Sequence, residues 1–142
     1  MARPQRRTTP DIPRRLDASV RATRKAAWQA RRALRRLALP WPLGDDAELL
    51  LSELVTNSVR HAGLGEGDLI RITADWSETR LKVVVRGGRG VPPPTVAGSI
   101  RPAPGAESGW GLFLVNRLAS RWGTAAGGYW FELRHQPPGL DS

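Results

Sequence analysis

The sequence of 142 residues contains no cysteine and no long apolar segment, and both absences narrow what the chain can be. Without cysteine, disulfide scaffolds, thiolate metal sites and cysteine nucleophiles are excluded. The apolar runs fall well short of the roughly 20 residues that a membrane-spanning helix needs. The first residues, Met-Ala-Arg-Pro-Gln-Arg-Arg, lack the apolar core of a secretory signal. These absences predict a cytoplasmic protein without membrane contact.

Negative charge is scarce at the front of the chain. The sequence has a net charge of +9, from 22 lysines and arginines against 13 aspartates and glutamates. Residues 1–36 hold twelve of these cations and only two anions, Asp11 and Asp17, so this segment carries +10. The remaining ten cations and eleven anions nearly cancel. The asymmetry predicts an acidic partner for the front end, either a protein or nucleic acid.

The length predicts one domain. Residues 1–15, rich in arginine and proline, are interpreted as a basic disordered arm, residues 16–134 as the folded domain and residues 135–142 as a tail. Apolar residues recur at helical spacing over residues 16–38 and again over 47–62. Pro40 and Pro42 separate these two predicted helices, and Asp45 or Asp46 is expected to cap the second.

The second half of the chain predicts strands and one more helix. Residues 69–74 and 80–85 have the composition of two strands joined in a hairpin, and residues 129–133 that of a final strand. Residues 87–109 are dense in glycine and proline and predict a long loop, which is usually functional or disordered. A helix is expected over residues 110–122. Hairpin strands combined with helices on one face indicate an α+β two-layer sandwich.

Polar residues gather on one side of the second predicted helix. Glu53, Asn57, Arg60 and His61 fall within roughly 100° of arc on a helical projection. A carboxylate, an amide and an imidazole in this arrangement can hold a hydrated divalent cation and orient a water molecule. Taken alone, the same residues also fit an ordinary solvated helix face.

Two glycines mark the point where the long loop meets the third predicted helix. Gly109 and Gly111 flank Trp110 and precede Leu112. Without Cβ atoms, the backbone N–H groups there can approach a phosphate at the helix N-terminus. A structural turn explains the same two residues when they are considered in isolation.

Together, these two motifs carry a resemblance to a known family. The chain resembles the GHKL, or histidine-kinase-type, ATPase domains, and within them the anti-sigma-factor serine/threonine kinases of actinomycete bacteria. Residues 53–61 are similar to the N box of that family, and residues 109–115 to its second glycine box. The resemblance implies the Bergerat fold, with helices on one face of a mixed, mainly antiparallel sheet.

The resemblance also implies roles for particular residues. Asn57 would coordinate Mg²⁺ bridging the phosphates of ATP, and Glu53 would polarise the attacking hydroxyl as the catalytic residue. Residues 91–108 would form the ATP lid, and His61 would support the site rather than bind the metal. The residues that the resemblance assigns to cofactor binding are Asn57, His61, Arg86, Gly88, Gly90, Gly109, Trp110, Gly111 and Leu112.

The adenine side departs from the family pattern. The first glycine box normally carries an aspartate that accepts a hydrogen bond from the adenine amino group. Aligning on Gly88 and Gly90 puts Arg86 at this position, whereas a slip of one residue puts Gly87 there. A guanidinium only donates, as the adenine amino group does, and a buried unsatisfied donor costs about 1–3 kcal/mol. Gly128 likewise stands where the family usually has a threonine before the last strand.

The implied function is phosphoryl transfer within a regulatory switch. The kinase would phosphorylate a serine or threonine of an anti-anti-sigma (STAS-type) protein and bind that protein and a sigma factor in alternation, usually as a homodimer. Because the adenine side departs from the pattern, the alternative is a nucleotide-independent partner-binding module of the same fold. A third hypothesis is a nucleic-acid-associated protein that uses the basic front end, although the sequence carries no recognised DNA-reading motif.

Overall fold

The structure is a computed structural model that describes residues 14–61, 64–65, 67–87, 110–125 and 127–136, with the backbone alone at residues 61, 110–113 and 125. Its elements follow the order β1 (Arg15–Arg21), α1 (Ala26–Leu34), the 3-10 turn η1 (Arg35–Leu37), α2 (Leu43–His61), β2 (Leu69–Trp76), β3 (Arg80–Gly87), α3 (Trp110–Leu118), β4 (Arg121–Ala125) and β5 (Gly128–Arg134). The strands form one sheet in the order β1-β2-β3-β5-β4, and all four pairings are antiparallel.

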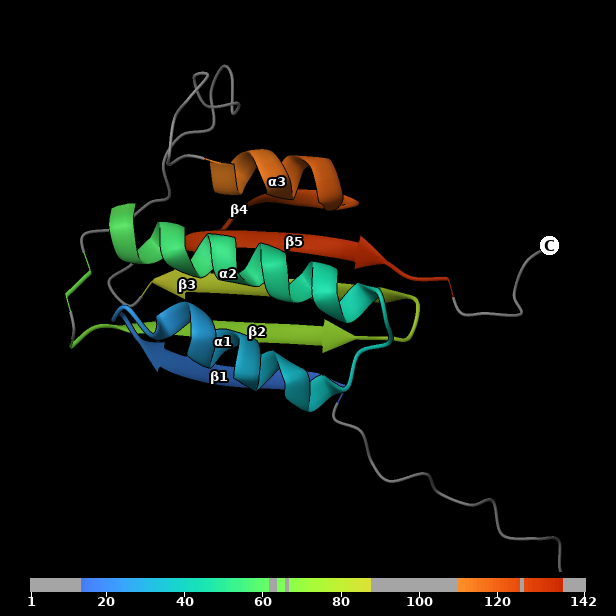
Figure 1. Ribbon diagram of the computed structural model, residues 1–142, viewed down its shortest axis with the longest axis horizontal. Helices are drawn as coiled ribbons and strands as arrows, with labels where there is room; N and C mark the ends of the chain where they lie inside the picture. Colours follow the sequence, from blue (N-terminus) through green and yellow to red (C-terminus); the bar gives the residue numbers. More distant parts are fainter. Residues whose placement is uncertain (1–13, 62–63, 66, 88–109, 126, 137–142) are drawn as a thin grey trace, which may run out of the picture.

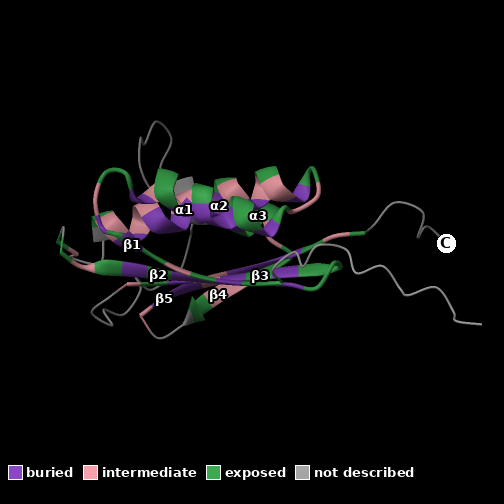
Figure 2. Cartoon of the chain, turned by 90° about the horizontal axis from the view of Figure 1, so that it is seen from below, coloured by how far each residue is buried: buried purple, intermediate pink, exposed green. Residues whose placement is uncertain are grey.

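The three helices cover one face of this sheet (Figures 1 and 2). Alternate strand residues point toward the helices, and strand pairing keeps them level across the sheet, as in the pairs Ile72 with Val85 and Val83 with Phe131. These four side chains are completely buried, and together with Leu50 and Leu54 of α2 they form the core. The predicted α+β two-layer sandwich is confirmed.

The predicted helix over residues 16–38 is wrong in its first part, because residues Arg15–Arg21 form the edge strand β1. Leu16 and Val20 are buried, and the exposed Arg15 and Asp17 alternate with them. A spacing of four residues between two apolar side chains fits one helical turn and also two strand repeats, so the pair does not distinguish the two structures. The regular alternation around them is the strand signal.

The predicted helix over residues 110–122 is also too long. Helix α3 ends at Leu118, and residues Arg121–Ala125 form the edge strand β4. Trp122 is therefore not part of the apolar face of the helix. It is a residue of β4 and pairs with Phe131 of β5. A five-residue strand gives only a weak period-2 signal, so the apolar spacing of the helix extends into it without a visible break.

The second helix begins earlier than expected. The backbone N–H of Gly44 donates to the Pro40 carbonyl at 2.9 Å, and that of Asp46 donates to the Pro42 carbonyl at 3.2 Å, so the helical bonding starts next to the prolines. Asp45 and Asp46 therefore lie in the first turn of α2 and not at its N-cap. Carboxylates in a first turn still interact favourably with the helix dipole.

Candidate functional site

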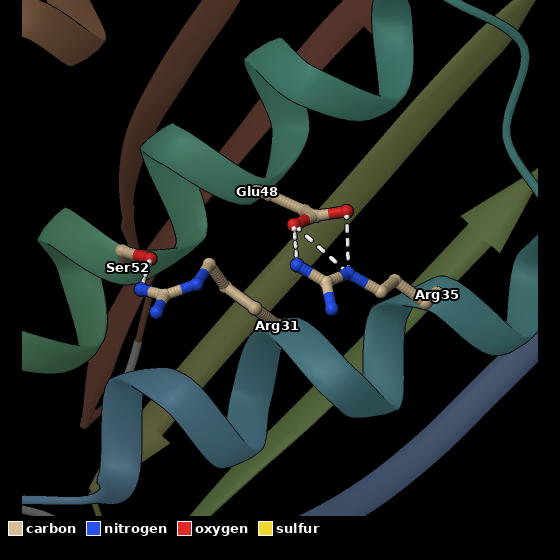
Figure 3. Close-up of polar contacts among 4 residues, drawn as sticks. All are labelled: Arg31, Arg35, Glu48 and Ser52. Carbon is tan, nitrogen blue, oxygen red and sulfur yellow. Dashed lines mark hydrogen bonds and ion pairs between the residues drawn. The ribbon is translucent and has the colours of Figure 1, made fainter.

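Helix α2 is fixed in rotation by its buried face and by its contacts with α1. Leu50, Leu51 and Leu54 are fully buried against the sheet. On the flank toward α1, Arg35 makes a two-pronged ion pair with Glu48, with N···O distances of 3.0–3.2 Å (Figure 3). Beside it, Arg31 donates a 2.7 Å hydrogen bond to the Ser52 hydroxyl. Two arginines of the basic front end are therefore used inside the domain.

The opposite flank of α2 carries Glu53 and Asn57. These residues are about 40° apart on the helical projection, and Asn57 is about 140° away from Ser52. They consequently face the side on which α3 packs against α2 (Figure 1). Both side chains are half-buried, and neither has a hydrogen-bond or ion-pair partner among the described residues. This pair of polar groups is available to a ligand.

The other predicted site residues gather at the same end of the molecule as far as they are described. Helix α2 ends at His61 and α3 begins at Trp110, with Gly111 and Leu112 in its first turn, and the two helix ends lie at one end of the fold (Figure 1). The first backbone N–H groups of a helix lack partners within it and can bind an anion. Gly88, Gly90 and Gly109 lie outside the described residues.

Arg86 lies on the other side of the sheet. Val85 is completely buried beneath the helices, so strand alternation points the exposed Arg86 side chain to the face without helices. Gly87 then faces the helical layer, where a Cβ atom would contact Leu64 at 3.5 Å. Of the two alignments, the one that uses Gly87 puts the family's adenine position on the same face as Asn57. Neither alignment provides a carboxylate.

Gly128 is held by close backbone packing. It pairs with Arg86 on one side and Ala125 on the other. A Cβ atom at this position would overlap the carbonyl oxygen of Val85 and lie 2.8 Å from the Cα atom of Arg86. A threonine cannot be accommodated there without a backbone shift.

Tyr129 is a polar residue of this region that the sequence analysis missed as a candidate. It points into the layer between sheet and helices, level with Val85, and is only 3% exposed. Among the described residues its hydroxyl has no hydrogen-bond partner, and burial raises the pKa of the phenol. In the sequence it appeared only as an aromatic of the last strand, and a single tyrosine gives no signal of an orphaned hydroxyl.

The Asn57 and Glu53 side chains could bind Mg²⁺ only together with a further ligand such as a phosphate. Within the described part of the chain, no group of three or more histidine, cysteine, aspartate or glutamate residues is placed to hold a metal ion. The Asn57 amide and the Glu53 carboxylate offer two unpartnered oxygen-bearing groups. Mg²⁺ commonly uses one or two such groups, several waters and the phosphates of a substrate. The residues present are therefore compatible with a metal–phosphate complex.

Comparison with known protein families identifies the family to which the sheet, the α2 flank and helix α3 belong. The sequence profile of the histidine kinase-like ATPase domain matches residues 16–129, which run from the second residue of β1 to the second residue of β5 and include all three helices. The chain belongs to the histidine kinase-like ATPase family. The antiparallel five-stranded sheet with helices on one face agrees with the fold expected for that family.

Among solved structures, the chain is similar to the RsbU and RsbW domains of Rv1364c from Mycobacterium tuberculosis, with a TM-score of 0.55 and 25% sequence identity. The match covers 90% of this chain and 32% of that chain, so this ATPase-family chain spans about one third of the matched protein's length. Comparison with curated proteins gives no significant match.

A groove on this ATPase-family domain lies between α1 and the edge strand β1. It has a volume of about 430 Å³ and is lined by apolar groups such as Val20 and Ala33, with Arg21 and Arg36 among its polar residues. Strand β1 pairs only with β2 among the described strands, so its outer edge is open beside the groove. Among the described residues, no helix is long and apolar enough to cross a bilayer.

Proposed function

We propose that this chain is an anti-sigma regulatory factor of the ATP-binding serine/threonine kinase type, which binds a sigma factor and an anti-anti-sigma (STAS-type) protein in alternation. The observation that carries the proposal is the pair of unpartnered, half-buried side chains Glu53 and Asn57 on the α2 flank toward α3. Membership of the histidine kinase-like ATPase family and the similarity to a chain with an RsbW domain support it.

In the proposed reaction, ATP supplies the γ-phosphoryl group and Mg²⁺ offsets the charge that develops on it. The amide oxygen of Asn57 would serve as a ligand to the metal. The carboxylate of Glu53 would accept a hydrogen bond from the serine or threonine hydroxyl of the substrate and so orient it. The backbone N–H groups at Trp110, Gly111 and Leu112 would donate to phosphate oxygens, with Gly88, Gly90 and Gly109 as further expected contacts. Positioning and charge neutralisation would carry most of the rate enhancement.

A second candidate function follows from the adenine side. Gly87 offers no side-chain acceptor to the adenine amino group, and the Arg86 side chain points to the other face of the sheet. In this candidate, the same fold captures its partner proteins without nucleotide. The groove beside β1 supports it, because an open strand edge with apolar residues and two arginines suits an extended acidic segment.

The proposed domain bounds, cellular location and oligomeric state are the same for both candidate functions. We propose that residues 16–134 form the functional domain, flanked by the segments 1–15 and 135–142, and that the protein acts in the cytoplasm as a homodimer. Arg31 and Arg35 are engaged with α2, which leaves fewer cations of the front end for nucleic acid. A protein partner is therefore favoured over nucleic acid for that segment.

Calorimetric titration of the full chain with Mg-ATP separates the two candidates. The kinase candidate predicts saturable binding that Asn57→Ala weakens by at least about tenfold, since the metal loses its amide ligand. Gln29→Ala, on the exposed side of α1, is the matched control and should leave the affinity unchanged. The absence of heat at millimolar ATP would end the kinase candidate, and capture of an acidic partner by the Asn57→Ala variant at wild-type affinity would then support the second one.

A further inference from the structure

The face of the sheet that the helices leave uncovered carries an excess of positive charge. Strand alternation and register place on it eight cations and three anions among the described residues. The cations are all exposed. They are Arg15, Arg21, Arg71, Arg80, Lys82, Arg86, Arg121 and Arg134. We call this set, with the residues between them, the open face.

Two anions of the open face form ion pairs within it, and the third lies between two cations in the strand register. Asp17 accepts two hydrogen bonds from Arg71, at 2.6 and 3.0 Å, and this guanidinium lowers the pKa of its carboxyl group. Asp75 pairs with Arg15 at 2.9 Å. Glu132 is only 7% exposed and stands between Lys82 and Arg121 in the register. At the two ends of the face, Arg80, Arg134 and Arg86 have no ion-pair partner among the described residues.

Like charges stand directly opposite each other at these ends. Arg80 faces Arg134 across the β3–β5 pairing, and Arg86 faces Arg71 across the β2–β3 pairing. Like charges at opposed positions destabilise a sheet. Asp17 already offsets the charge of Arg71, so an anionic partner would relieve the repulsion between Arg80 and Arg134 at one end and would pair with Arg86 at the other. The two ends are therefore candidate anion contacts.

The middle of the open face is apolar. Val84 lies next to Trp130 across the β3–β5 pairing. The Trp130 ring rests on the β4 backbone at Gly123, where a Cβ atom would be 2.9 Å from its indole nitrogen. Lys82 and Arg121 stand over the ring, at 4.9 and 5.9 Å from its centroid. The face thus presents a half-buried aromatic ridge with cations on either side.

We propose that the open face binds an acidic protein helix that lies along β3 and β5, with carboxylates at both ends and apolar side chains in the middle. Arg80 and Arg86 are six residues apart, or about 20 Å along a strand. A helix rises 1.5 Å per residue, so a segment of about 13 residues reaches from one arginine pair to the other. The occupant is thus an amphipathic acidic helix of three to four turns, and nucleotide plays no part in its binding.

Charge on the face argues against two other occupants. A second copy of the chain would bring the same excess of cations against it. A nucleic acid strand carries negative charge at every nucleotide, and along β3 and β5 it would lie over the apolar Val84 and beside the carboxylate of Glu132. A helix with acidic ends places its negative charge only where the arginine pairs are.

The test uses a covalently stapled helical peptide of about 14 residues, with glutamates in its first and last turns and leucines between them. Titrated into isotope-labelled full-length protein, it should shift amide resonances of β3 and β5. The same peptide with glutamine in place of glutamate should bind at least about tenfold more weakly. Arg80→Glu with Arg134→Glu should reduce the affinity by a similar factor, whereas the matched control, Arg24→Glu with Lys25→Glu before α1, should leave it within about twofold.

Three results would overturn the inference. These are equal binding of the two peptides, an equal loss of affinity in both double variants, and resonance shifts confined to the helices. Tight binding of a single-stranded oligothymidine that the acidic peptide cannot displace would assign the face to nucleic acid instead. Circular dichroism of each variant checks that it is folded. A parallel Mg-ATP titration on the same sample separates failure here from failure of the proposed kinase function.

Discussion

Arg86 and Gly87 are adjacent on β3 and point to opposite faces of the sheet. Arg86 faces Arg71 on the uncovered side, whereas Gly87 faces the helical side, where an added Cβ atom would meet Leu64. The Arg86 guanidinium therefore belongs to a different surface from the one that carries Asn57. Under the proposed kinase function, Gly87 takes the adenine position on the side of Asn57, and it supplies neither a carboxylate nor a cation. A missing acceptor weakens nucleotide binding less than a buried guanidinium would.

Replacing Gly87 by aspartate should strengthen Mg-ATP binding. The new Cβ atom meets Leu64 at 3.5 Å, an ordinary contact, and the carboxylate faces the helical layer. A regained hydrogen bond with a charged acceptor supports a gain of about tenfold or more in affinity. Arg86→Asp is the matched substitution and should give no gain, because its carboxylate would face the uncovered side. A larger gain from Arg86→Asp than from Gly87→Asp, measured by calorimetry, would contradict this assignment of faces.

Substitution of the two α2 flank residues should affect ligand binding and leave the fold intact. Glu53 and Asn57 are half-buried and have no side-chain partners among the described residues, so Glu53→Gln and Asn57→Ala should change the free energy of unfolding by less than about 1 kcal/mol. Leu54→Ala, one position further round the helix, removes a fully buried side chain and should cost about 2–5 kcal/mol. Urea denaturation compares the three variants. A loss of stability in Asn57→Ala comparable to that in Leu54→Ala would indicate a structural role for the amide.

The sequence patterns were most informative where one face of an element is buried over many residues. The α2 helix and the β2–β3 hairpin were predicted within a few residues, because each presents a long and regular series of apolar side chains. Strands β1 and β4 were missed because they are edge strands with only two or three inward side chains each. Two apolar residues such as Leu16 and Val20 fit either period, and tertiary pairing with Ala74 and Ile70 decides between them.

The residues of the candidate site also differ in how well the sequence predicts them. Glu53 and Asn57 could be predicted as neighbours, since helix geometry alone puts residues four apart on one side. The orientation of Arg86 depends on which residue of β3 enters the core, and a run of three valines before it gives no alternation to count from. The orphaned hydroxyl of Tyr129 depends on its surroundings in three dimensions, and no local pattern reports it.

Two glycines provide a matched test of backbone packing at the site end of the sheet. Gly128→Ala places a methyl group over the Val85 carbonyl, so the β3–β5 pairing must shift, and we expect a loss of about 2–4 kcal/mol of stability. At Gly67 a Cβ atom would meet nothing within 4 Å, and Gly67→Ala should be neutral or slightly stabilising. Thermal denaturation of both variants gives the comparison. Equal melting temperatures would show that the two strands can separate at Gly128 without cost.

Removing the orphaned hydroxyl of Tyr129 should stabilise the protein and change its response to alkaline pH. Tyr129→Phe keeps the ring in its buried position and deletes a polar atom that has no partner among the described residues, so the free energy of unfolding should rise by about 1 kcal/mol. In the wild type, burial raises the pKa of this phenol above the usual value of 10.0. The unfolded chain then ionises first, so the stability associated with the neutral phenol is complete below the unfolded pKa and decreases as the pH rises past it.

The phenylalanine variant lacks this ionisable group and should lose less stability between neutral pH and the alkaline range than the wild type does. Urea denaturation at neutral pH and above the pKa of free tyrosine measures both effects. Trp130→Phe, on the uncovered face of the same strand, is the control for a change of aromatic residue and should leave the alkaline response unchanged. If Tyr129→Phe instead lowered stability at neutral pH, the hydroxyl would have a partner in solution. A simultaneous loss of Mg-ATP affinity would identify that group as a ligand contact.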